Sequence, residues 1–95
     1  MSDEQAFRVT VETDGGDSKE VETNPHMQML AFMEKVVALF YPGSHPPVTE
    51  YDIIINEQDQ PYSAWAGKTV GEMDIGPSTE LVLLGPAPKG VLWIQ

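Results

Sequence analysis

The sequence of 95 residues contains no cysteine. A disulfide framework, a thiolate metal site and a thiol nucleophile are therefore all excluded. The chain also lacks an apolar run long enough to span a membrane, and its first residues do not have the charged and then apolar regions of a signal peptide. We therefore expect a cytoplasmic protein. Hydrophobic residues still make up 41% of the chain, which is enough for the core of one small domain.

Basic residues are scarce as well. The chain has 5 lysines and arginines against 15 aspartates and glutamates, and its formal net charge is −10. A negative field of this size repels nucleic acid and anionic lipid, and it favours basic partner surfaces or simply solubility. We therefore expect binding to neither nucleic acid nor membranes.

A β-hairpin is predicted near the start of the domain. Residues 7–13 alternate apolar and polar side chains, as in a half-buried strand, and residues 18–23 form a weaker second strand. Between them, residues 14–17 contain two glycines, which favour a tight turn. Residues 1–6 are polar and acidic, and we expect them to be disordered.

A helix is predicted to follow the hairpin. Asn24 is a favoured N-cap and Pro25 suits the first helical position, while Pro42 disfavours continuation of the helix. From Met27 to Phe40, apolar residues recur on one side. The stripe expected to face the core consists of Met29, Leu30, Met33, Val36, Val37 and Phe40, flanked by Phe32 and Leu39.

The second half of the domain is predicted to complete a sheet. Its expected elements are a strand at 51–55, a turn at 56–61, a short edge strand at 62–65, a one-turn helix at 68–75 with Thr69 and Glu72 in a capping box, and a buried strand at 80–84. This order predicts an α+β fold, in which one main helix packs across a mixed sheet of four to five strands and a short helical turn precedes the last strand. The first and last strands are expected to pair in parallel at the centre of the sheet.

Two stretches make the sequence similar to ubiquitin. They are residues 67–75, GKTVGEMDI, and residues 78–83, STELVL. The chain resembles the ubiquitin-like β-grasp family, and most of all the bacterial single-domain ubiquitin-like proteins. The resemblance implies a β-grasp domain at residues 7–84, a C-terminal tail at 85–95, and partners that comprise an activating enzyme, a conjugating enzyme and a deubiquitinase-like, metal-dependent peptidase.

The resemblance also implies that the tail is the reactive part of the protein. Modifiers of this family are adenylated and joined to their targets through a C-terminal glycine, and the candidate in this chain is Gly90. Lys89 stands where the family carries a second glycine, and the segment 91–95 lies beyond. The hypothesis that the protein is a modifier therefore requires a peptidase to cleave the chain after Gly90. The alternative is that Gly90 only turns the chain.

The segment beyond Gly90 suggests a second function. Leu92, Trp93 and Ile94 are apolar and β-prone, so they could pack on their own sheet, pair with a second molecule, or dock in a partner's groove. In this reading the protein is a non-covalent adaptor or regulatory subunit. A sulfur carrier is less well matched, because it requires a free terminal glycine pair.

The outer face of the sheet is the other candidate binding surface. Ubiquitin carries an apolar patch there, and the equivalents in this chain are Ile54 with Val82 and Leu84. The last strand is apolar at successive positions, so the sequence leaves open whether Val82 and Leu84 or their neighbours Leu81 and Leu83 face outward.

Nothing in the sequence predicts catalysis, a metal or a cofactor. His26 and His45 lack a nucleophile or ligand partner at motif spacing, and we expect both to be exposed. The acidic residues around the first turn, at 14–22, lack the spacing of a calcium loop. We therefore expect a protein that acts by being bound or attached, and not an enzyme.

Overall fold

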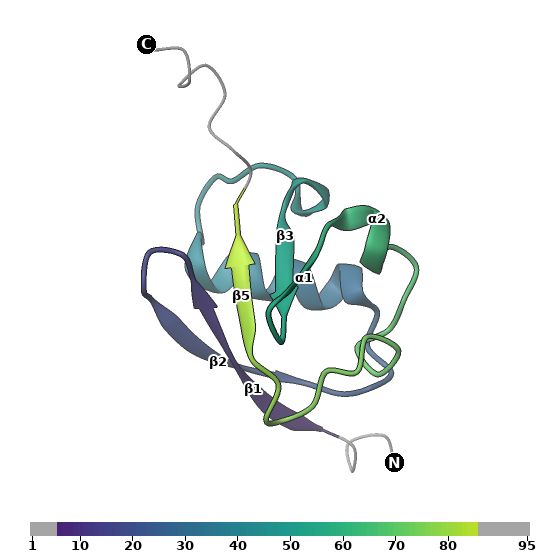
Figure 1. The fold of residues 1–95 in the computed structure, drawn as a ribbon. Helices are drawn as coiled ribbons and strands as arrows, with labels where there is room; N and C mark the ends of the chain where they lie inside the picture. Colours follow the sequence, from purple (N-terminus) through teal and green to yellow (C-terminus); the bar gives the residue numbers. More distant parts are fainter. Residues whose placement is uncertain (1–5, 86–95) are drawn as a thin grey trace.

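The computed structural model describes residues 6–85, which form one sheet with a helix behind it (Figure 1). The elements in chain order are β1 (Phe7–Thr13), β2 (Ser18–Thr23), α1 (Met29–Phe40), the 3-10 helix η2 (Val48–Glu50), β3 (Asp52–Ile55), β4 (Gln58–Gln60), α2 (Tyr62–Trp65) and β5 (Leu81–Leu84). The expected α+β architecture is confirmed. No helix of the described part is long and apolar enough to cross a membrane.

The sheet has five strands in the order β2-β1-β5-β3-β4. β1 and β5 pair in parallel at its centre, as the sequence predicts, while the pairs β1–β2, β3–β5 and β3–β4 are antiparallel. The last strand of the domain is thus inserted between two strands that come much earlier in the chain. Both long edges of β5 are occupied, which fixes its register from two sides.

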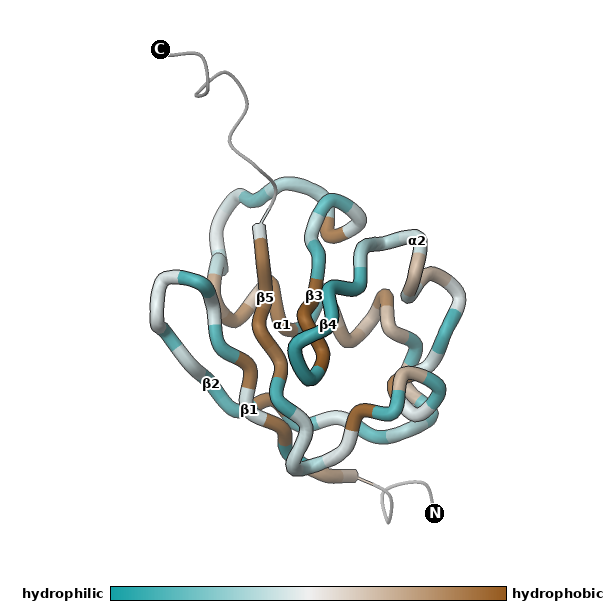
Figure 2. The backbone as a smooth tube through the Cα atoms, viewed as in Figure 1, coloured by the Kyte–Doolittle hydropathy of each residue, from teal (hydrophilic) through white to brown (hydrophobic). Residues whose placement is uncertain are grey.

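One layer of apolar side chains fills the space between α1 and the sheet. Alternate residues of β1, β3 and β5 point into it, in keeping with the two-residue period of a strand. The largest fully buried side chains are Trp65, Phe32, Met29, Met33, Ile53, Leu81 and Leu83. Figure 2 shows the apolar residues concentrated along β3 and β5, next to the largely hydrophilic β4.

The buried face of the main helix is largely as predicted, with Met29, Met33, Val36 and Val37 in the core, although Phe32 is also fully buried and Leu30 is 45% exposed. The predicted start of the helix is wrong. Asn24 caps a turn, because its side-chain Oδ1 accepts from the backbone N of His26 at 2.9 Å, and α1 begins only at Met29. The cause lies in residues far along the chain, since the carbonyl of Pro25 accepts from the N of Gly71 at 2.9 Å.

The predicted turn and edge strand after β3 are exchanged. The edge strand is β4, within the segment expected to turn, and the segment expected to be a strand is the short helix α2. Asn56 and Glu57 make the tight connection between β3 and β4 with positive φ angles of 51° and 74°. Two successive residues with positive φ match the twist of a two-residue hairpin turn. Such turns usually have the sequence Asn-Gly, and this one was not predicted because glutamate stands in place of the glycine.

The capping box predicted at Thr69 is present. The N of Glu72 donates to Thr69 Oγ1 at 3.2 Å, and the N of Thr69 donates to Glu72 Oε1 at 2.9 Å. The segment closes a single turn, with the N of Met73 donating to the carbonyl of Thr69 at 3.1 Å, and does not continue as a regular helix. The turn leads the chain towards β5.

Thr69→Ala is expected to lower the free energy of unfolding by about 1 kcal/mol, the usual effect of removing a capping hydroxyl. The backbone N of Glu72 loses its acceptor in this variant. Urea denaturation measures the effect, with Ser78→Ala, another exposed hydroxyl in the following loop, as the control. Equal midpoints for the two variants would show that the box does not stabilise the domain.

Candidate functional site

The outer face of the sheet carries an apolar patch, which we define as Ile54, Val82 and Leu84. On β5 the side chains of Leu81 and Leu83 are each 1% exposed, so Val82 and Leu84 point to the opposite, solvent-facing side and are partly exposed. Ile54 on β3 is the register partner of Val82. The structure therefore answers the question that the sequence left open and brings the three predicted residues together.

Acidic side chains surround this patch. Glu12 on β1 is the register partner of Val82 on the other side of β5, and Asp52 on β3 is the partner of Leu84. Asp59 on β4 lies opposite Ile54. Because register partners share a face of the sheet, these carboxylates frame the patch on three sides.

The two aspartates of this frame influence each other. Burial raises the pKa of Asp52 above its ordinary value, and a hydrogen bond and the charge of Asp59 raise it further. Both the burial and the neighbouring carboxylate disfavour the charged form of Asp52. Among the described residues the recorded ion pair is that of Arg8 with Glu20, 3.8 Å apart across β1 and β2.

Asp52→Asn is expected to stabilise the domain slightly at pH 7. Because folding raises the pKa of Asp52, its stabilising contribution is present below the unfolded pKa and is lost as the pH rises through the folded pKa. Solvent screening keeps the gain below about 1 kcal/mol. Denaturation midpoints measured from acid to neutral pH test this, with Asp14→Asn in the exposed hairpin turn as the control. A gain that persists unchanged at acid pH would contradict it.

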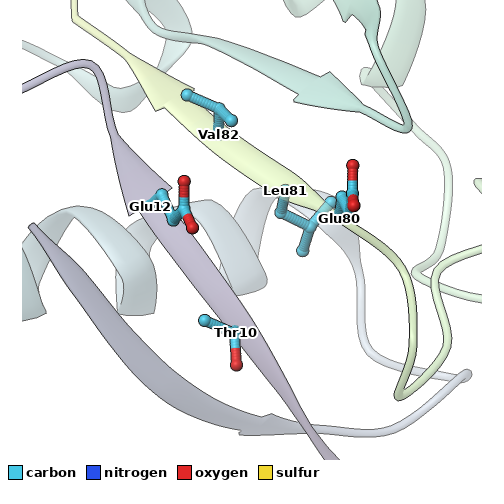
Figure 3. A pocket seen from close by; sticks show the side chains of 5 residues that line it. All are labelled: Thr10, Glu12, Glu80, Leu81 and Val82. Carbon is cyan, nitrogen blue, oxygen red and sulfur yellow. The ribbon is translucent and has the colours of Figure 1, made fainter. Parts of the chain in front are cut away.

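A hollow opens on the same face where β1 and β5 begin to pair (Figure 3). Its volume is about 190 Å³, and it is lined by Thr10, Glu12, Glu80, Leu81 and Val82. Thr10 and Glu12 come from β1, whereas the other three come from β5 and the residue before it. The hollow is therefore continuous with the apolar patch at Val82.

The backbone of Glu80 is held firmly although its side chain is exposed. Its N donates to Asn56 Oδ1 at 3.0 Å, and its carbonyl accepts from the N of Asn56 at 2.9 Å. The turn between β3 and β4 thus fixes one wall of the hollow. Sequence reasoning missed Glu12 and Glu80 as site residues, although the alternation of β1 places Glu12 on the outer face.

The other predicted site residues, Gly90, Leu92, Trp93 and Ile94, lie outside the described residues, as do residues 1–5. His26 is exposed, and so is His45, whose Nδ1 lies 2.7 Å from the carbonyl oxygen of Pro46. Across residues 6–85 there is no group of three or more His, Cys, Asp or Glu side chains that could hold a metal ion.

A second hollow lies on the helix side of the molecule. Its volume is about 550 Å³, and its lining residues are Leu30, Glu34, His45, Pro47, Val48 and Thr49. The exposed Leu30 makes it largely apolar and Glu34 and His45 add polar groups, but nothing in the described residues indicates what would fill it. The outer face of the sheet, with its defined patch and acidic frame, is the better candidate site.

Solved structures with the same fold are known. A designed protein described as based on ubiquitin matches with a TM-score of 0.68 and 19% identity, over 90% of this chain and 95% of the other. An Arabidopsis thaliana protein matches with a TM-score of 0.66 and 13% identity, over 90% and 93%. No family model and no curated protein matches the sequence. At these identities the likeness shows the fold alone, and that fold is the ubiquitin-like β-grasp.

Proposed function

We propose that this ubiquitin-like domain is a protein modifier of a bacterial, cytoplasmic ubiquitination-like pathway. Partners recognise it through the apolar patch, and it is joined to targets through Gly90 after a peptidase has removed residues 91–95. The observation that carries the proposal is the position of the patch on β5: Val82 and Leu84 lie on the strand that leads directly to the tail.

This arrangement suits a modifier because recognition and attachment use one strand. An enzyme that grips the patch at Leu84 holds the chain just before the exposed Gly85. Five residues, 85–89, separate Leu84 from Gly90, and an extended chain of that length spans about 15–20 Å. The sequence places prolines at 86 and 88, and proline favours extended backbone because it fixes φ and cannot donate to a sheet.

The chemistry that we propose for the tail proceeds in three steps. The peptidase hydrolyses the bond between Gly90 and Val91, which leaves a carboxylate on Gly90. The activating enzyme then joins this carboxylate to the α-phosphate of ATP and releases pyrophosphate. A nucleophile of the enzymes then displaces AMP and carries Gly90 as an ester or thioester, and a target amine displaces that nucleophile and forms an amide with Gly90. Glycine suits each step because it has no Cβ to obstruct a narrow active site.

Intact-mass analysis tests the proposal. The protein is mixed with a deubiquitinase-like, metal-dependent peptidase from its own organism and afterwards with an activating enzyme from the same source and ATP. We expect loss of residues 91–95, followed by adenylation of the new terminus. Gly90→Pro is expected to prevent the cleavage, whereas Gly85→Ala, at an exposed position whose added Cβ would make only ordinary contact with Tyr51, is expected to preserve it. An unchanged mass with an enzyme active on another substrate would contradict the proposal.

A non-covalent adaptor is the second candidate, and the acidic frame favours it. A modifier needs only transient contact with its enzymes, whereas charge around an apolar centre suits a lasting and selective complex. In this case the protein co-purifies with one partner at fixed stoichiometry and its mass does not change. Substitution of Val82 would then abolish the complex, while Gly90→Pro would leave it intact.

A further inference from the structure

The hollow between β1 and β5 combines apolar surface with negative charge. Val82 contributes the apolar side chain and Glu12 and Glu80 contribute the carboxylates, while the side chain of Leu81 is buried in the core beneath. The recorded side-chain hydrogen bonds of the described residues include none to either carboxylate. Both groups therefore keep their full capacity to accept hydrogen bonds from a ligand.

Three of the four basic side chains of residues 6–85 make contacts elsewhere in the domain. Arg8 pairs with Glu20 towards the β2 edge. Lys19 lies over the ring of Phe40, with its Nζ 5.9 Å from the centroid, and Lys35 Nζ donates to the carbonyl of Glu22 at 2.6 Å. The fourth, Lys68, is not among the residues that line the hollow, so no basic side chain of residues 6–85 lines it, and a cation supplied by a partner molecule would offset its charge.

We propose that the hollow receives an arginine side chain of a partner protein, with the guanidinium between Glu12 and Glu80 and the aliphatic stem along Val82. The inference rests on the proposed role of the outer face as the recognition surface, and it adds the chemistry of the partner. Residues next to that arginine are apolar, because they cover Ile54 and Leu84.

Charge and shape both favour arginine in this place. The guanidinium offers five donors in a planar fork, enough for two carboxylates and the hydroxyl of Thr10, whereas lysine offers a compact charge with three donors. The aliphatic stem of arginine also covers apolar surface without burying the charge. A divalent cation fits less well, since no group of three acidic or histidine side chains exists in the described part of the chain.

A second acidic pair lies at the other edge of the patch. Burial raises the pKa of Asp52 there, and a hydrogen bond and the charge of Asp59 raise it further. The four carboxylates lie at different positions of the same face: Glu12 on β1, Glu80 just before β5, Asp52 on β3 and Asp59 on β4. A partner that is both basic and apolar therefore meets complementary groups across the width of the sheet.

Titration of the isotope-labelled full chain with synthetic peptides, followed by NMR, tests the inference. The probe is a short peptide with blocked ends and one arginine flanked by leucines, and the matched peptides carry glutamine or lysine in its place. We expect the arginine peptide to shift the amide signals of Thr10, Glu12 and Val82. The dissociation constant of the glutamine peptide is expected to be higher by about tenfold or more.

Paired variants separate this site from the general negative charge of the protein. Glu12→Gln/Glu80→Gln is expected to weaken the arginine peptide by about tenfold and to leave the glutamine peptide unchanged. Glu34→Gln/Glu50→Gln removes the same charge from exposed positions on α1 and η2, and it is expected to change neither. Amide spectra of the unbound variants confirm that both pairs are folded.

Three results would overturn the inference: no shift at the hollow, equal weakening in both double variants, or equal affinity for the lysine and arginine peptides. None of these results bears on Gly90, because the titration includes no enzyme. If cleavage after Gly90 occurs but the peptide does not bind, the modifier proposal stands and the arginine assignment fails. If the peptide binds and the mass never changes, the arginine assignment stands and the modifier proposal fails.

Discussion

Leu83→Ala is expected to lower the free energy of unfolding by about 2–5 kcal/mol, whereas Val82→Ala is expected to cost less than about 1 kcal/mol. The two residues are neighbours on β5, but Leu83 is 1% exposed in the core and Val82 faces solvent. Leu83 is also the register partner of Ile53 and of Thr13, so its loss leaves a cavity at the sheet centre. Urea denaturation followed by circular dichroism measures both values.

The comparison tests which face of β5 is buried. Both variants shorten one apolar side chain on the same strand, so the intrinsic strand preference changes in the same direction for each. A larger loss of stability in Val82→Ala would mean that β5 is shifted by one residue, which would turn the proposed patch into the core.

Val82→Lys is expected to leave the domain folded and to slow processing of the tail by about tenfold or more. A long cationic side chain at the centre of the apolar patch removes the contact surface, and truncating a central contact of an interface commonly has an effect of this size. It also places a positive charge beside Glu12 and Glu80, where it competes with the partner's arginine. The measurement is the rate of mass loss with the peptidase and of adenylation with the activating enzyme.

Ala38→Lys is the matched control for this variant. Ala38 is an exposed residue of α1, on the far side of the core from the patch, and the substitution adds the same side chain and charge. We expect its processing rate to equal that of the unmodified protein. If Val82→Lys is processed at the same rate as Ala38→Lys, the outer face is not the surface that these enzymes recognise.

Much of the fold could be predicted because local signals and tertiary contacts agree there. The alternation of residues 7–13 matches β1, and the spacing of Thr69 and Glu72 matches the capping box. The parallel pairing of β1 and β5 follows from the family resemblance and from the handedness of the crossover, and the register confirms it.

The wrong secondary-structure predictions occur where contacts with a distant segment of the chain determine the local structure. Asn24 and Pro25 carry a good helix-start signal, but the carbonyls of Pro25 and Met27 accept from the backbone N of Gly71 and Val70. These bonds hold the segment before α1 in a turn. Similarly, residues 62–65 are aromatic enough for a strand, yet they are helical with Trp65 fully buried. Neither outcome can be read from a local pattern.

The candidate site could be predicted in its apolar part but not in its charged part. Ile54, Val82 and Leu84 were expected from the ubiquitin resemblance, and only the pairing of β5 with two neighbours decides which of its side chains face outward. Glu12 and Glu80 are separated by most of the chain, so no sequence motif joins them. The parallel pairing at the sheet centre brings them to one hollow.

The most direct test of a modifier is a search for its remnant on target proteins. Trypsin cleaves after Lys89, so digestion of a conjugate leaves the single residue Gly90 on the modified amine. Proteins from cells that express the unmodified chain and the Gly90→Pro variant are compared by mass spectrometry, without iodoacetamide, whose adduct has the same mass as glycine. We predict lysines that carry one added glycine only in cells with the unmodified chain. Absence of such lysines, in cells where the protein and its enzymes are present, would contradict conjugation through Gly90.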